Sequence, residues 1–155
     1  LAVFYLIRIL IGENLINVLY DKEVTFFFLA FSISIFCGFA FIKRLNNLQR
    51  NIGNDIHQGY IYSEPHIMTL KSFSLFFGIS SIIIFFMYSL GPAQENYLHP
   101  EFLLLALIFL SIFYWRLYFF ASKGSMNYDP IVFSFSNPEP IVLMIITSFI
   151  FYYSY

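Results

Sequence analysis

Residues 24–42 have the sequence VTFFFLAFSISIFCGFAFI, a run of 19 residues without a charged side chain. A helix rises about 1.5 Å per residue, so a run of this length can cross the roughly 30 Å hydrocarbon layer of a bilayer. A strand of a membrane barrel would instead alternate apolar and polar residues over about ten positions. The run does not alternate in this way, and it therefore predicts a transmembrane helix.

Similar apolar runs recur along the chain, at residues 1–20, which turn polar after Gly12, and at residues 72–90, 102–122 and 141–155. The helix-breaking pair Gly91-Pro92 closes the second of these runs, and Arg116 alone interrupts the third. We therefore predict an all-α fold, an integral membrane bundle of about five transmembrane helices in one domain over residues 1–155. Because the chain starts and stops inside apolar runs, we expect it to be a piece of a longer protein.

The composition supports the same class of protein. Hydrophobic residues make up 59% of the chain and charged residues only 11%, whereas a soluble domain carries about 25% charged residues. The formal net charge of −1 argues against nucleic acid as a partner, because nucleic acid requires a clustered basic face. The partner that the composition predicts is the lipid bilayer.

The distribution of Lys and Arg predicts how the bundle is oriented. Residues 43–71 contain four of these cations and residues 116–140 contain two, whereas residues 91–101 contain none and residues 13–23 contain one against three acids. Cytoplasmic connections of membrane proteins are enriched in Lys and Arg. We therefore predict that residues 43–71 and 116–140 face the cytoplasm.

Two polar segments could carry chemistry. The first runs from Lys43 and Arg44 through an amide-rich stretch to Arg50, and Arg and Lys together can hold a phosphate or diphosphate. The alternative is that Lys43 and Arg44 only end a helix. The second segment contains Arg116 and Asp129; Arg116 either faces a ligand or reaches to the interface, and Asp129 before a proline is also typical of a helix start.

Two acid-x-His pairs, Asp55 with His57 and Glu64 with His66, follow the first segment. Such residues can ligate metals, but nothing in their spacing fixes a tetrahedral or octahedral set. Solvated loop histidines are the alternative.

Several segments together resemble the C-terminal half of UbiA-type membrane prenyltransferases. They are FYLIRILIG (4–12), FFFLAFSISIFCGFAFIKRLNNL (26–48), HQGY (57–60), MYSL (87–90), YLHPEFLL (97–104) and YWRLYFFASKGSMNYDPIVFSF (114–135). The branch in question comprises bacterial members, often fused to a haloacid-dehalogenase-like domain, and it also resembles decaprenyl-phosphate phosphoribosyltransferases. The resemblance covers nearly the whole chain, and residues 123–135 are its most specific part.

The resemblance implies a nine-helix bundle of which this chain supplies about helices five to nine, so that the N-terminal half lies elsewhere in a longer protein. It implies a transferase of the inner (plasma) membrane that moves a prenyl or phosphoribosyl group from a diphosphate donor to a lipid or aromatic acceptor, with a polyprenyl lipid as substrate. Without the N-terminal half, this chain is expected to be inactive.

The resemblance also suggests a set of site residues. The expected diphosphate-binding residues are Lys43, Arg44, Arg116 and Lys123. Mg²⁺ is the implied cofactor, with Asp129 and Asp55 as ligands in this chain and its main ligands in the N-terminal half.

Neutral residues replace charged ones of that branch at several positions. Asn47 stands where the branch has Glu, Tyr128 where it has Asp, and Asn137-Pro138 where it has Asp-Arg. A non-catalytic membrane scaffold or a fragment of a transporter is the alternative function. An upstream half resembling this one in inverted order would favour a transporter.

Overall fold

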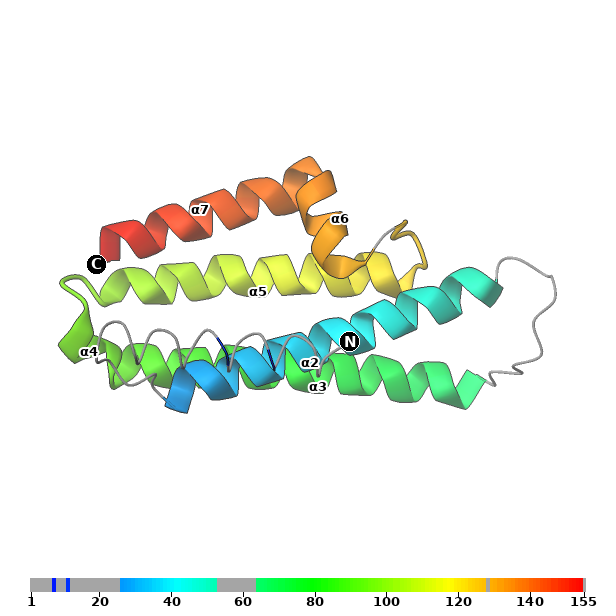
Figure 1. The fold of residues 1–155 in the computed structure, drawn as a ribbon, viewed down its shortest axis with the longest axis horizontal. Helices are drawn as coiled ribbons and strands as arrows, with labels where there is room; N and C mark the ends of the chain where they lie inside the picture. Colours follow the sequence, from blue (N-terminus) through cyan, green and yellow to red (C-terminus); the bar gives the residue numbers. More distant parts are fainter. Residues whose placement is uncertain (1–6, 8–10, 12–25, 53–63, 128, 155) are drawn as a thin grey trace.

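A computed structural model describes residues 7, 11, 26–52, 64–127 and 129–154. Every regular element in these ranges is a helix (Figure 1). The helices are α2 (Phe26–Ile52), α3 (Glu64–Leu90), α4 (Ala93–Asn96), α5 (Glu101–Ser122), α6 (Pro130–Ser136) and α7 (Pro138–Ser154). The prediction of an all-α fold is confirmed for the described part of the chain.

Three helices are long and apolar enough to cross a membrane, over Phe26–Arg50, His66–Leu90 and Glu101–Ser122. The shortest has 22 residues, or about 33 Å of helix, which matches the hydrocarbon layer. Helices α6 and α7 pass the same test only together, and they are bent by 91° at their junction. The described residues thus contain three candidate spans, or four if the bent pair is one span. The predicted number of about five is not confirmed. The span predicted over residues 1–20 lies outside the described residues, except for Ile7 and Ile11.

Small residues bring α2 and α3 close together. Ser34 of α2 donates a hydrogen bond of 2.9 Å from its hydroxyl to the carbonyl of Phe77 in α3. Gly38 of α2 and Gly78 of α3 are buried, and the Tyr114 ring of α5 lies against both glycines. Helices in membranes associate through such small residues because their backbones can then approach closely.

Helix α2 continues well beyond the predicted helix end. It runs through Lys43 and Arg44 to Ile52, so the idea that these two cations end the helix is wrong. The reason is packing, because Leu45 and Leu48 beyond them are buried against Leu70 of α3. The predicted connection over residues 43–71 is therefore largely helical.

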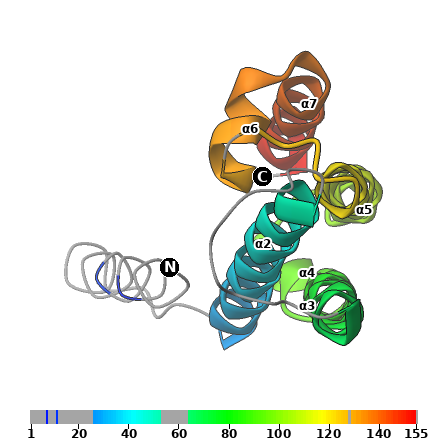
Figure 2. The ribbon, with the colours of Figure 1, turned by 90° about the vertical axis from the view of Figure 1, so that its right-hand side faces the viewer.

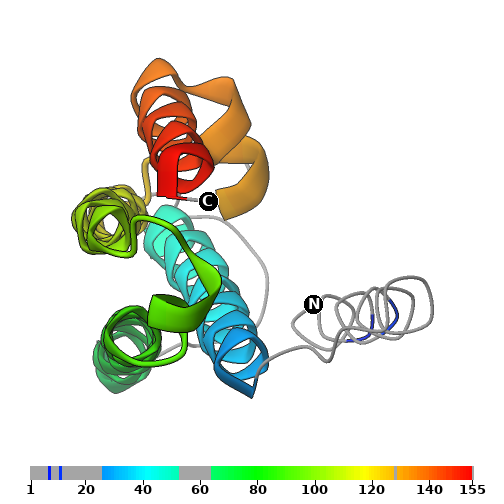
Figure 3. The same ribbon diagram turned by 90° about the vertical axis from the view of Figure 1, so that its left-hand side faces the viewer.

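Successive long helices run in opposite directions, so the connections alternate between the two ends of the bundle (Figure 1). The end of α2, the start of α3 and the connection between α5 and α6 lie at one end (Figures 1 and 2). Residues 91–100 and the C-terminus lie at the other end (Figure 3), where His99 N–H donates a hydrogen bond of 3.1 Å to the carbonyl of Ser154. The end of α2 and the connection after α5 belong to the two segments predicted to share one side, and they lie at the same end of the bundle.

Candidate functional site

Two distant segments meet at the end of the bundle that we call the basic end, formed by the C-terminal half of α2, the N-terminal part of α3, and residues 123–129. All six Lys and Arg residues that the structure describes lie either in the loop of residues 123–129 or in the half of their helix that is nearer to the basic end. They are Lys43, Arg44, Arg50, Lys71, Arg116 and Lys123. The two polar segments that the sequence singled out therefore belong to one region of the molecule.

Asn46 fixes the loop of residues 123–129 to α2. Its side-chain amide donates a hydrogen bond of 2.8 Å to the carbonyl of Met126, and the Met126 N–H donates one of 3.1 Å to the Asn46 side-chain oxygen. Asn46 and Met126 are both buried. A buried amide with both ends satisfied holds one conformation, because any shift would leave polar groups unpaired.

Gly124 brings the backbones of the loop and α2 into direct contact. Its φ of +67° is a conformation that glycine adopts without steric cost. A Cβ at this position would lie 3.0 Å from the backbone nitrogen of Arg50 and 3.1 Å from atoms of Gln49. Glycine is therefore required here both by its backbone conformation and by the close approach of α2.

Lys43 and Asp129 form an ion pair across this junction, with 2.5 Å between Lys43 Nζ and an Asp129 carboxylate oxygen. Their side chains are 34% and 20% exposed, respectively. Asp129 is the residue before α6, and Pro130 is in the first turn, as the sequence predicted. The Asp129 side chain makes no capping hydrogen bond, because its carboxylate is directed to Lys43 instead.

Arg116 is engaged by Glu139, in the first turn of α7. Its guanidinium carbon also lies 5.1 Å from the centre of the Phe120 ring. The pair joins α5 to α7, so Arg116 has a carboxylate partner 23 residues away that sequence reasoning did not predict. Arg116 is one of the predicted diphosphate-binding residues, but the Glu139 carboxylate already balances its charge.

Two further predicted site residues are accessible. Arg44 is exposed on α2. Lys123 is exposed at the end of α5, and its Nζ lies 4.1 Å from the centre of the Phe119 ring. Asp55 and Tyr128 lie outside the described residues.

The described residues do not form a metal site. Within residues 26–52, 64–127 and 129–154, no three His, Cys, Asp or Glu side chains come together. Mg²⁺ requires several oxygen ligands, commonly one or two carboxylates together with substrate phosphates, and Asp129 already holds a cation. Of the two implied ligands in this chain, Asp129 is bonded to Lys43 and Asp55 lies outside the described residues.

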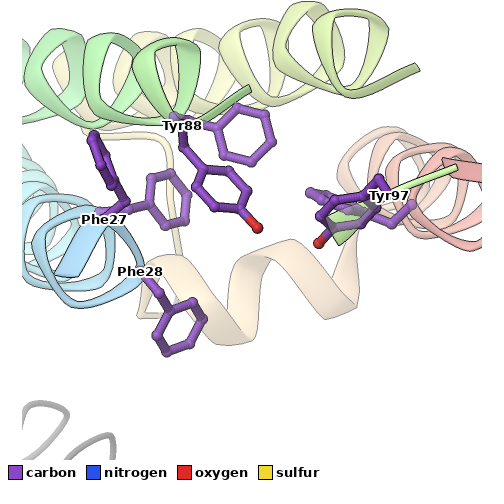
Figure 4. Close-up of a pocket in the computed structure, with 7 residues that line it drawn as sticks. Phe27, Phe28, Tyr88 and Tyr97 are labelled. Atoms are coloured by element: carbon purple, nitrogen blue, oxygen red, sulfur yellow. The ribbon is translucent and has the colours of Figure 1, made fainter. Parts of the chain in front are cut away.

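A cavity of about 220 Å³ lies toward the opposite end of the bundle (Figure 4). The described residues that line it are all aromatic, and we call it the aromatic cavity. The lining residues are Phe27, Phe28, Phe31, Phe85, Tyr88, Tyr97 and Phe151. They come from α2, α3, α7 and the connection before α5, so only tertiary packing could reveal the cavity.

Within the aromatic cavity the rings contact one another at a variety of angles. The Phe31 and Phe85 centroids are 5.7 Å apart, and those of Phe85 and Phe151 are 5.8 Å apart and nearly perpendicular. Tyr88 and Tyr97 also pack edge to face, at 6.4 Å. The cavity is thus suited to apolar atoms, with two phenol groups as its polar component.

No known protein family, characterised protein or solved structure matches the chain.

Proposed function

We propose that the chain is part of a membrane-embedded transferase of the UbiA prenyltransferase type, which moves a prenyl or phosphoribosyl group from a diphosphate donor to a lipid or aromatic acceptor. One observation carries the proposal. The segments for which the resemblance implies site residues, around Lys43-Arg44 and around Asp129, come from different helices and meet at the basic end, where Lys43 bonds to Asp129.

The charges at the basic end suit a diphosphate leaving group. Negative charge develops on that group as the donor carbon is attacked, and fixed cations stabilise it. Arg44 can offer two parallel N–H groups to phosphate oxygens, whereas Lys43 offers a point charge. Asp129 would act as a positioning residue by holding the Lys43 ammonium in place.

The aromatic cavity suits the apolar part of a polyprenyl substrate. Phe31 and Lys43 are 12 positions apart on α2, about 18 Å along the helix axis. Lys43 reaches Asp129 before α6, and Phe31 lines the cavity together with Phe151 of α7. Burial of each CH₂ group stabilises binding by about 0.8 kcal/mol, so an elongated apolar substrate could use both ends of the bundle.

The orientation in the proposal places the basic end at the cytoplasm. The described cations all belong to that end, whereas Glu95, His99 and Glu101 lie at the other. Lys and Arg are enriched on the cytoplasmic side of bacterial inner-membrane proteins.

The proposal is tested by Arg44→Ala in the protein at full length. Loss of a charge-assisted hydrogen bond to phosphate costs on the order of 1.5–3 kcal/mol, so the dissociation constant of a labelled prenyl diphosphate should rise roughly ten- to a hundredfold. Arg44→Lys should recover only part of the affinity, because an ammonium cannot make the bidentate contact. Equilibrium binding to purified, reconstituted protein measures these values.

Lys71→Ala is the matched control, because it removes another cation of the basic end from a different helix. Its affinity for the prenyl diphosphate should equal that of the parent. If Arg44→Ala also binds like the parent and only the amount of protein in the membrane falls, Arg44 is an anchor. The scaffold or transporter alternative would then be favoured.

A further inference from the structure

The Asn46 side chain joins the two segments of the basic end from inside the protein. It exchanges two hydrogen bonds with the peptide group of Met126, of 2.8 Å and 3.1 Å. Asn46 is 3% exposed and Met126 is fully buried. An anion bound at the basic end would therefore find almost no surface of Asn46 to contact, so any effect of this residue on a ligand has to pass through other residues.

The amide of Asn46 is matched to this contact. An asparagine side chain presents a donor and an acceptor side by side, and here they face the carbonyl and the N–H of the same residue, Met126. An alanine at position 46 could supply neither partner. Because buried peptide groups that lose their partners are costly, the two hydrogen bonds fix the Met126 backbone relative to α2.

The fixed backbone in turn determines where Asp129 lies. Asp129 follows Met126 by three residues, and Lys43 precedes Asn46 by three on α2. Residues three apart lie on the same face of a helix, which is why Lys43 and Asn46 both reach the segment that contains Met126 and Asp129. The Lys43 Nζ is 2.5 Å from an Asp129 carboxylate oxygen. These four residues form a closed circuit, so a change at Asn46 displaces Asp129 relative to Lys43.

We propose that Asn46 is a positioning residue of the donor site. It places Asp129, and through Asp129 it places the Lys43 ammonium that would hold the diphosphate. The inference rests on the proposed function for the identity of the ligand. It goes beyond that function by giving a role to a buried amide to which the resemblance assigns none. Binding groups have to be held within about 0.5 Å of the productive geometry, so a small shift of Lys43 is sufficient to lower affinity.

The test measures binding of labelled inorganic diphosphate, the group that prenyl and phosphoribosyl donors share, to the reconstituted protein at full length. Asn46→Ala should raise the dissociation constant roughly fivefold, within the range found for coupled neighbouring residues. Ser125→Ala is the matched control. It removes a hydrogen bond of 3.0 Å that stays between the same loop and the Phe120 carbonyl of α5, so it should bind like the parent.

A second variant moves the same loop without touching Asn46. A Cβ at Gly124 would lie 3.0 Å from the backbone nitrogen of Arg50, and the φ of +67° at this position disfavours any side chain. Gly124→Ala should therefore also weaken diphosphate binding. Two unrelated changes that displace the loop and give the same loss cannot be explained by the chemistry of one side chain.

Asp129→Asn separates positioning from a general loss of stability. If Asn46 acts through Asp129, then Asn46→Ala should raise the dissociation constant no further in an Asp129→Asn background, because residues in one network are not additive. A residue that only stabilises the fold would leave the affinity of the folded protein unchanged. An Asn46 effect that multiplies with that of Asp129→Asn would overturn the inference.

Arg44→Ala, measured with the same probe, distinguishes this inference from the proposed function. If Arg44→Ala weakens binding while Asn46→Ala and Gly124→Ala bind like the parent, only the inference fails. If Asn46→Ala weakens binding while Arg44→Ala does not, the inference holds and the role given to Arg44 is wrong. A parent protein that binds no diphosphate would overturn both.

Discussion

Tyr114 lies where three helices meet, and two glycines make room for it. Its hydroxyl donates a hydrogen bond of 2.6 Å to the carbonyl of Ser74 in α3, and its ring stacks on Phe39 of α2 at 6.1 Å between centroids. A Cβ at Gly38 would lie 2.5 Å from the Tyr114 oxygen. A Cβ at Gly78 would lie 2.1 Å from a ring carbon. The junction of α2, α3 and α5 therefore requires a residue without a Cβ at both positions 38 and 78.

Gly78→Ala should destabilise the protein by about 1–3 kcal/mol, because the added methyl group forces the rigid Tyr114 ring out of a filled space. Gly91→Ala is the matched control, since its Cβ would meet only an ordinary contact at 3.5 Å. Thermal denaturation in detergent should show a lowered Tm for Gly78→Ala alone. Equal Tm values for the two variants would mean that the ring has freedom to move aside.

At the scale of elements, the loop of residues 123–129 depends on α2 for its conformation. Asn46 supplies both hydrogen bonds to Met126, and Gly124 lies against the α2 backbone. The Lys43–Asp129 pair closes the same junction at the start of α6. The loop is thus held at three points along α2.

Asn46→Ala should release this loop, because the N–H and carbonyl of Met126 lose their buried partners at a cost of about 1–3 kcal/mol each. Limited proteolysis between residues 123 and 129 should become faster. Asn47→Ala changes the same residue type one position along the same helix, at an exposed site, and should be cleaved like the parent. Unchanged cleavage of Asn46→Ala would mean that the other two contacts suffice.

At the scale of the whole molecule, the antiparallel bundle separates its two ends by a membrane thickness. Ser125 at the basic end and Asn96 at the other are both exposed. The single native thiol, Cys37, is half-buried within α2. These features allow the orientation of the bundle to be measured by cysteine labelling.

In a Cys37→Ala background, an impermeant maleimide should label Asn96→Cys in intact cells and Ser125→Cys only after the cytoplasmic side is opened. The expectation follows from the concentration of Lys and Arg at the basic end. Labelling in the reverse order would invert the orientation, and labelling of both cysteines from one side would contradict the bundle itself.

The features of this protein that depend on local properties can be predicted from its sequence. Uncharged apolar runs specify helices of membrane length, and helix α3 ends just before Gly91-Pro92 as predicted. Helix α5 begins at Glu101, after His99-Pro100. Apolar content, helix breakers and charge distribution act within a few residues of one another, so they can be interpreted without a tertiary structure.

The end of α2 and the pairing of charges depend instead on contacts between helices. The extension of α2 to Ile52 depends on buried contacts with Leu70, and Lys43 meets Asp129 across 86 positions. In the sequence Asn46 is only one of several amides. In the structure α2 continues past it, its side chain is buried, and it holds the loop of residues 123–129 through two hydrogen bonds to Met126. Such choices arise from contacts between residues far apart in the chain, and their free energy appears only when the helices pack.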